Sequence, residues 1–347
     1  AAVLSPDGTQ LALIMDSVLH VMPMNGDGSP AGAAVPITTE VADLPSWGGD
    51  SRTLLYKSAE KLRLIQADGS GARDVPVDLT WQQKTGEGTT IVHAGAVWDG
   101  VSLQVNMEIV IRGNRIKEIR SSQGGERKDT ADVRHVDASG LTVIPGLWDP
   151  HIHPLTLYQG GQFGQISALL LAYGITSTQS VAGPVHQSLE IRESLEAGRL
   201  IGPRVFISPP LWEGNRLFYS FARTLRTPAI AQLEIDKALR LDVDYLKSYV
   251  RGPIPNMALI AQAGLDFGIP TGTHMLAPGA AVGLGGTTHL SATQRMGYGW
   301  SKSTNGITYQ DAADLHAKSG FNNVDTLFSS LALVGNDPAF TADDRFR

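Results

Sequence analysis

The stretch LTVIPGLWDPHIH, residues 141–153, decides the fold that we expect for most of the chain. Its β-branched and apolar residues are typical of a strand, and this strand ends on His151 and His153. Because successive side chains of a strand point to opposite faces, residues two apart share a face. The two imidazoles are therefore placed either to bind one metal ion or to be two polar residues of a turn.

Strands and helices alternate after this stretch, as they do in a parallel sheet with crossover helices. Strands are expected at 175–181, 204–208, 244–250, 269–275 (IPTGTHM), 286–291 (GTTHLS) and near 325–334 (DTLFSSLALV). Helices are expected at 164–174, 186–200, 228–241, 255–268 and 309–319. With the first strand this makes seven of the eight strands of a TIM barrel. We therefore predict an α/β fold with an incomplete TIM (β/α) barrel over residues 143–347.

Histidines and a lysine stand at the ends of these strands, where TIM barrels carry their active sites. His151 and His153 end the first strand, Lys247 the fourth, His274 the fifth and His289 the sixth. The 94 residues from His153 to Lys247 span three β/α units of about 30 residues each. Only 15 residues separate His274 from His289, so we expect the fifth crossover to be mostly loop. Neutral imidazoles suit zinc, iron, nickel or copper.

Residues 1–80 contain an internal repeat in which Asp7 aligns with Asp50, 43 residues later. The aligned segments are LSPDGTQLAL (4–13) with WGGDSRTLLY (47–56), and LHVMPMNGDG (19–28) with LRLIQADGSG (62–71). Each unit has two β-runs bounded by turns, and a period of about 40–45 residues is that of a propeller blade. We predict about two blades of a β-propeller here, with a plain β-meander as the alternative.

Residues 88–142 contain short alternating strands in TIVHAGAVWDG (90–100), MEIVIRGNRIKEI (107–119) and RHVDASG (134–140). We predict a small β-sandwich for this part, joined to the repeat by the polar, Gly-bearing linker WQQKTGEGT (81–89).

The composition restricts the class of protein. Hydrophobic residues make up 42% of the 347, which is typical of a globular chain, and no apolar run approaches the ~20 residues of a membrane span. The net charge of −6 argues against a nucleic-acid partner. There is no cysteine, so disulfides, cysteine nucleophiles and zinc–thiolate sites are excluded. The oligomeric state stays open, with a homo-oligomer as one alternative.

VIPGLWDPHIH (143–153), preceded by VHAGAVWDG (92–100) and IVIRGNRIKEI (109–119), resembles the amidohydrolase superfamily of metal-dependent hydrolases. The likeness covers about residues 88–347. The SPDG turn (5–8) followed by an apolar strand resembles the blades of TolB-type propellers. Together these parts resemble the TolB-propeller-fused amidohydrolases, whose relatives include imidazolonepropionase-like and prolidase-like enzymes.

The resemblance implies one or two divalent metal ions, with zinc the expected ion, bound by His151, His153, Lys247, His274 and His289. It further implies that Lys247 is carboxylated and bridges two metals, since a protonated lysine cannot be a ligand, and that Lys247, His274 and His289 take part in catalysis. The expected activity is hydrolysis of amide, peptide or cyclic amide C–N bonds in a small molecule or short peptide. TolB-type blades imply a periplasmic or secreted setting.

The resemblance also calls for an aspartate at the end of an eighth strand, as general base. The available aspartates fall on expected helices and loops around the seventh strand: Asp311, Asp314, Asp325, Asp337, Asp343 and Asp344. We therefore expect the chain to be catalytically incomplete, to continue past Arg347 and to begin inside a larger propeller. A binding protein or remnant without turnover, and a deaminase of the same superfamily, are the alternatives.

Several residues near these strand ends have two interpretations. Lys247 is a ligand, or it extends to solvent or pairs with Asp244. Tyr249 and Arg251 hold a substrate carboxylate or carbonyl, or belong to a polar loop. The segments LWEGNRLFYSF (211–221) and MGYGWSKS (296–303) line a substrate pocket or only pack at the surface. The remaining histidines are expected to be structural or at the surface: His20, His93, His135, His186 and His316.

Overall fold

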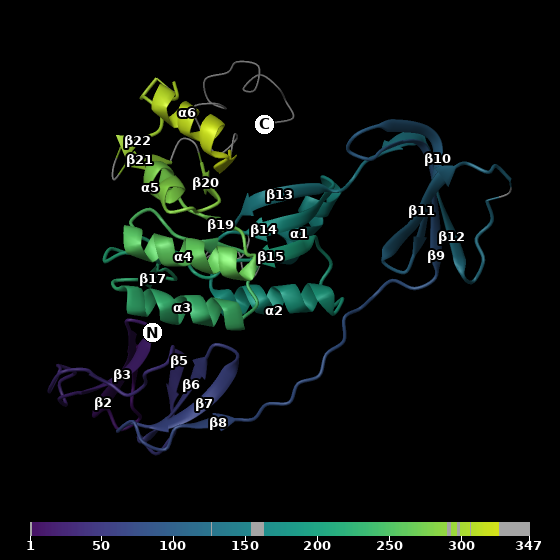
Figure 1. Ribbon diagram of the computed structural model, residues 1–347. Coiled ribbons are helices and arrows are strands. Elements are labelled where there is room, and N and C mark those ends of the chain that lie inside the picture. Colours follow the sequence, from purple (N-terminus) through teal and green to yellow (C-terminus); the bar gives the residue numbers. More distant parts are fainter. Residues whose placement is uncertain are drawn as a thin grey trace.

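The computed structural model describes residues 2–125, 127–153, 163–289, 293–296, 299–305 and 307–325. It has three parts (Figure 1): an N-terminal module of small sheets, a separate four-stranded sheet reached through an extended linker, and an α/β part. The N-terminal module lies against two helices of the α/β part, and the separate sheet stands away from both. In the described residues no helix is both long and apolar enough to cross a membrane.

The N-terminal module, residues 2–75, consists of two four-stranded antiparallel sheets, each in chain order. The strands are β1 (Ala2–Leu4), β2 (Gln10–Met15), β3 (Val18–Pro23), β4 (Val35–Pro36), β5 (Asp43–Trp47), β6 (Thr53–Ser58), β7 (Lys61–Gln66) and β8 (Arg73–Val75). The two sheets share one apolar core that contains Leu19, Leu54 and Tyr56. Two sheets do not make a closed ring, so the structure shows the repeat without showing a propeller.

The two repeat units align with a constant offset over their strands, but the offset changes at the turn that ends each unit. Strands β3 and β7 begin 43 residues apart, whereas the equivalent turn aspartates Asp27 and Asp68 are 41 apart. Each of these aspartates accepts a hydrogen bond from the backbone N–H of a serine two residues later. The first turn opens at Asn25, two residues past the end of β3, and the second opens at Gln66, the last residue of β7.

The separate sheet has the order β11-β10-β9-β12, in which only β9 and β12 are parallel. Its strands are β9 (Thr89–Trp98), β10 (Leu103–Arg112), β11 (Arg115–Ser121) and β12 (Val133–Val143). The described residues place no second sheet against it, so the expected sandwich is a single sheet here. Apolar side chains at one end of it stay in solvent, including Leu103 at 58% and Val105 at 70% exposed.

The sequence predicts a single strand over 141–153. The structure instead has two strands there, in different sheets. β12 ends at Val143, and β13 (Leu147–Ile152) begins the α/β part. Pro145 between them lacks the N–H that a continuous ladder needs. A Cβ on Gly146 would collide with Thr176 of the adjacent strand, so only glycine lets the chain cross there.

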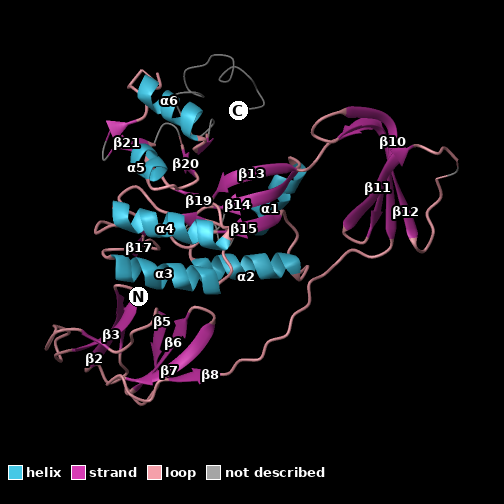
Figure 2. Cartoon of the chain, in the orientation of Figure 1, coloured by secondary structure: helices cyan, strands magenta, loops and turns pink. Residues whose placement is uncertain are grey.

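The α/β part is an arc of short parallel strands with helices packed along it (Figure 2). Its first sheet has three strands, in which β14 (Ile175–Ser180) lies between β13 and β15 (Arg204–Ile207). Three two-stranded parallel sheets follow. They are β16 (Trp212–Glu213) with β17 (Arg223–Thr224), β18 (Leu246–Lys247) with β19 (Thr271–Gly272), and β20 (Gly286–Thr288) with β23 (Asn322–Val324). A short antiparallel hairpin, β21 (Gln294–Met296) and β22 (Gly299–Trp300), adjoins the arc. Single bridges, such as Thr273 with Thr287, join neighbouring pairs. No barrel is closed among these residues.

The helices are α1 (Phe163–Ala172), α2 (Val185–Glu196), α3 (Pro228–Arg240), α4 (Ile254–Phe267), α5 (Leu276–Ala281) and α6 (Gln310–Ser319). Five match the expected helices to within a few residues. The sixth, α5, corrects the prediction that the fifth crossover is mostly loop. The last strand was expected near 325–334, but β23 precedes that segment, and 326–334 lie outside the described residues. The largest apolar core, which includes Ile207, Ile235 and Leu246, lies between strands and helices.

Candidate metal centre

The strand ends of the arc bring the five predicted residues together. His151 is the last residue but one of β13, His153 directly follows this strand, and Lys247 is the last residue of β18. His274 follows β19 by two residues, and His289 follows β20 directly. All five therefore lie at the carboxyl ends of parallel strands, as the sequence predicts.

The imidazole rings are in mutual contact. The Nε2 atoms of His151 and His153 are 3.2 Å apart. Ring centroids are 4.3 Å apart for His151 and His289, and 5.2 Å apart for His274 and His289. Ligand nitrogens of His151, His153 and His289 all lie within 4.8 Å of one another. We call His151, His153, His274, His289 and Lys247 the histidine cluster.

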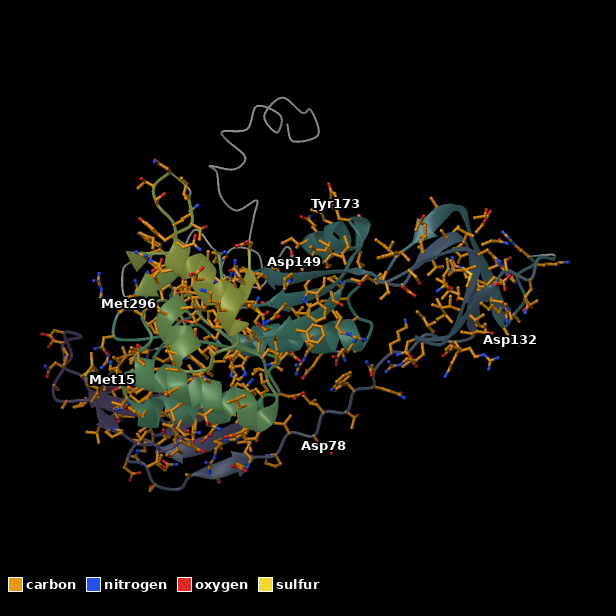
Figure 3. All side chains as sticks on the ribbon, turned by 45° about the horizontal axis from the view of Figure 1, so that its top comes forward. Met15, Asp78, Asp132, Asp149, Tyr173 and Met296 are labelled. Atoms are coloured by element: carbon orange, nitrogen blue, oxygen red, sulfur yellow. The ribbon has the colours of Figure 1, made fainter. Side chains whose placement is uncertain are left out.

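The geometry of the histidine cluster fits a metal ion. Two nitrogens bound to one tetrahedral zinc at ~2.0–2.1 Å are about 3.3 Å apart, close to the separation between His151 and His153. The Nδ1 atom of His151 is buried without a hydrogen-bond partner, which is uncommon for a buried polar atom. The side chain of Asp149 (labelled in Figure 3) helps to fix this strand end, because its Oδ1 accepts a hydrogen bond from the backbone N–H of His151 at 3.1 Å.

The electrostatics keep the four histidines neutral. Burial, together with the charge of Lys247, lowers the pKa of His153 and of His289 to about 4. The same two causes hold the pKa of His151 and His274 far below the ordinary value of 6.5. Because only a deprotonated imidazole nitrogen binds a metal, the cluster is ready for one at neutral pH.

Lys247 is completely enclosed, with 1% of its surface exposed, so it does not extend to solvent. Burial lowers the pKa of its amine to about 7. No carboxylate of the described residues pairs with it: Asp244 instead accepts hydrogen bonds from Arg192 at 3.1 Å and from the N–H of Ile207 at 2.8 Å. A neutral amine is the form that reacts with CO2, so the surroundings of Lys247 suit a carbamate.

Two backbone features hold the cluster. Lys247 pairs with Gly272 across β18 and β19, and a Cβ at Gly272 would collide with the hydroxyl of Tyr245. His289 has a φ of +60°, an uncommon conformation for a side chain other than glycine. Its N–H donates to the carbonyl of Val324 at 3.1 Å, which ties it to β23. Strained residues of this kind are often found at functional sites.

Of the two predicted substrate contacts, Tyr249 lies beside the cluster and Arg251 is engaged elsewhere. The ring centroid of Tyr249 is 4.8 Å from that of His274 and 5.9 Å from the Lys247 Nζ. Arg251 donates to the fully buried Glu213 at 2.8 Å. The sequence does not single out Glu213; its position as the one acidic residue of the aromatic-rich segment 211–221 is the available signal.

The remaining histidines lie away from the cluster in local contacts. His93 and His135 pair at 2.8 Å, His186 meets Lys57 at 3.2 Å, and His20 and His316 pair with the carbonyls of Val18 and Phe321. Among the aspartates considered as the base, Asp311 and Asp314 are on α6, and Asp325 directly follows β23. Asp337, Asp343 and Asp344 lie outside the described residues, and the described part of the chain contributes no carboxylate to the histidine cluster.

Known proteins share this fold at low sequence identity. A Xaa-Pro dipeptidase with methionine bound in its active site superposes with a TM-score of 0.57 at 18% identity, covering 75% of this chain and 71% of that one. Phenylurea hydrolase B gives 0.55 at 14% identity over 75% and 71%, and molinate hydrolase 0.54 at 16% over 69% and 63%. The chain therefore has a mixed α/β fold that it shares with these proteins and with a structure described as an amidohydrolase. No family model matches the sequence, and no curated protein matches it.

Proposed function

We propose that this chain is the metal-binding part of a hydrolase that cleaves amide, peptide or cyclic amide C–N bonds in a small molecule or short peptide. The observation that carries the proposal is the convergence of three histidine nitrogens within 4.8 Å, beside a buried lysine, at the carboxyl ends of the strands. Proteins of similar fold include a dipeptidase and two hydrolases of other substrates, which supports this class of reaction.

In the proposed site His151, His153, His274 and His289 hold one or two divalent ions, with zinc the expected ion. Lys247, as its carbamate, would supply anionic oxygen ligands. A divalent ion at such a site lowers the pKa of a water toward about 7 and polarises a carbonyl. The chain's own part is to keep four imidazoles neutral, to exclude bulk water around Lys247, and to place Tyr249 beside the reacting bond.

The rest of the molecule enters the proposal through its resemblance. Residues 1–80 are proposed as TolB-type blades, 88–142 as the small β-domain, and 143–347 as an amidohydrolase barrel without its last β/α unit. A periplasmic or secreted location would follow from the blades. The general base is proposed to come from an aspartate outside the described residues.

The metal content of the purified 347-residue protein tests this proposal. We expect near-stoichiometric zinc by mass spectrometry in the wild type, and less than about a tenth of it in the His151→Ala/His153→Ala double variant. The matched control is His135→Ala, whose imidazole pairs with His93 in the separate sheet, and it should keep the metal. Equal metal in all three proteins, or none, contradicts the proposed site.

The reaction class is tested on the zinc-loaded protein. Release of an amine and a carboxylate from dipeptides and N-acyl amides supports the hydrolase, whereas ammonia released from a ring amidine identifies a deaminase. Metal binding without turnover on either set would identify a binding protein that uses the same cluster. The observation that favours this last alternative is that the described residues bring no carboxylate into the histidine cluster.

A further inference from the structure

An aromatic surface adjoins the histidine cluster. The segment between β16 and β17 brings Tyr219 against Tyr249, which follows β18, and Phe221 of the same segment stacks on Tyr219. The centroids of Tyr219 and Phe221 are 5.3 Å apart with nearly parallel rings, and those of Tyr219 and Tyr249 are 6.0 Å apart. We call these three residues the aromatic wall. All three are half-buried, so their rings keep free surface for a ligand.

Tyr249 connects the wall to the cluster. Its ring packs edge-on against His274 at 4.8 Å between centroids. A group that touches the wall at Tyr249 therefore lies beside a proposed metal ligand, as a substituent next to the scissile bond must.

Hydrogen bonds to Glu213 hold the segment that carries Tyr219 and Phe221. Glu213 is fully buried and uses both carboxylate oxygens: one accepts from the N–H of Phe218 at 2.9 Å and the other from Arg251 at 2.8 Å. The backbone N–H of Leu225 donates to the Glu213 carbonyl at 2.7 Å, which closes the segment at its other end. A surface fixed before binding loses little conformational entropy when a ligand arrives.

The wall is also electrically neutral. Its rings carry no charge, and Glu213 and Arg251 beside it neutralise each other. A substrate carboxylate would have to compete with Glu213 for the guanidinium. Flat uncharged groups face no such competition, and aromatic pairs add attraction beyond simple area burial.

We propose that the aromatic wall is the specificity subsite of this protein and binds a planar, uncharged apolar group attached next to the scissile C–N bond. This inference rests on the proposed function, because it names the substrate class of the same site. Tyr219 is its central residue, since it contacts both other members. It is a specificity-determining residue, and the predicted carboxylate role of Arg251 is replaced by one of fixing the segment through Glu213.

The test is calorimetric binding of three hydroxamates to zinc-loaded and metal-free protein, which needs no turnover. Phenylacetohydroxamate and acetohydroxamate differ only by a phenyl ring, and succinic monohydroxamate carries a carboxylate. We expect zinc-dependent binding of acetohydroxamate, about tenfold tighter binding of the phenyl compound, and no gain for the carboxylate. Tyr219→Ala should reduce the phenyl preference to about twofold, and Tyr219→Phe should keep it.

The control is Tyr173→Ala, which removes a tyrosine that is 72% exposed beyond α1 (labelled in Figure 3) and should leave all three affinities unchanged. If acetohydroxamate needs zinc but the phenyl ring adds nothing, or its preference survives in Tyr219→Ala, the proposed function stands and the subsite is wrong. If zinc changes the binding of no probe, the proposed metal site itself is wrong, and the subsite falls with it.

Discussion

Lys247 shows at the scale of one residue how a site is built at the expense of stability. It is among the largest side chains that the described fold encloses completely, and no carboxylate of the described residues neutralises it. Burying an ammonium without a counter-charge destabilises the folded state, because the charge loses its hydration. Loss of the proton removes part of this destabilisation. The same neutral amine is what carbamate formation requires, so the stability cost and the proposed role have one cause.

Replacing Lys247 with methionine should therefore stabilise the metal-free protein while removing metal. The amine has a pKa of about 7 in the folded chain against an ordinary 10.5, so the unfolded chain binds more protons between these values. The wild-type free energy of unfolding should rise from pH 7 to 10, and Lys247→Met should lose this rise. At pH 6 we expect the variant to be more stable by about 1–4 kcal/mol in urea unfolding.

The matched control is Lys318→Met, because Lys318 is exposed on α6 and pairs with Asp314. It should change the free energy of unfolding by less than about 0.5 kcal/mol at any pH. If Lys247→Met is less stable than the wild type at pH 6, then Lys247 has a buried partner that outweighs its desolvation, and its proposed chemistry has to be abandoned.

At the scale of elements, the sequence predicts the helices of the α/β part better than its strands. Helix α4 ends at Gly268, whose φ of +67° is the left-handed cap that a glycine signals, and the apolar period fixes the rest. The fourth and fifth strands were expected over seven residues each but have two, β18 and β19. An apolar run in the sequence predicts that a segment is buried. The length of a strand depends instead on how many of its residues pair with a neighbouring strand, which the sequence does not show.

The candidate site was predictable to the extent that its chemistry is local. Histidines at strand ends with barrel spacing are a local signal, and the sequence predicts all five residues that the structure brings together in the histidine cluster. The sequence gives only a weak signal for Glu213, because its pairing with Arg251, 38 positions later in the chain, leaves no local pattern. The break between β12 and β13 was readable in principle, since Pro145-Gly146 is a turn signal inside an apolar run.

That break makes a prediction about β13. Gly146→Ala forces a methyl group into Thr176, so β13 and β14 must separate, and His151 and His153 move with them. We expect a loss of about 2–4 kcal/mol in urea unfolding and at least a tenfold weaker retention of zinc under chelator challenge. Gly140→Ala is the control, because nothing lies within 4 Å of its added Cβ and its φ is not positive. Equal behaviour of both variants would mean that β13 is not held by this crossing.

At the scale of the whole molecule, the N-terminal module is held to α3 and its neighbours through a buried ionic group. Asp43 on β5 accepts hydrogen bonds from Arg223 and from the Lys237 Nζ at 3.1 Å, and His186 lies 3.5 Å away. Burial alone would raise the pKa of Asp43, but His186, Lys237 and Arg223 together hold it well below 3.8. At the rim, Arg240 of α3 pairs with Glu60 at 2.9 Å.

The module should therefore separate from the α/β part when Asp43 loses its charge. Among the described residues, Asp43→Asn leaves Lys237, 1% exposed in its side chain, with Glu234 alone as counter-charge, and we expect a loss of about 3 kcal/mol. The wild type should weaken in the same way as the pH falls below about 4, since a depressed carboxyl pKa contributes stability only above it. Small-angle scattering should report a larger radius of gyration, and hydrogen exchange should report faster exchange along α3.

Asp74→Asn, which breaks a half-exposed pair with Lys61, is the control and should cause neither change. If α3 stays protected in Asp43→Asn, the apolar contacts alone hold the module, and the charges there select its orientation without supplying its affinity.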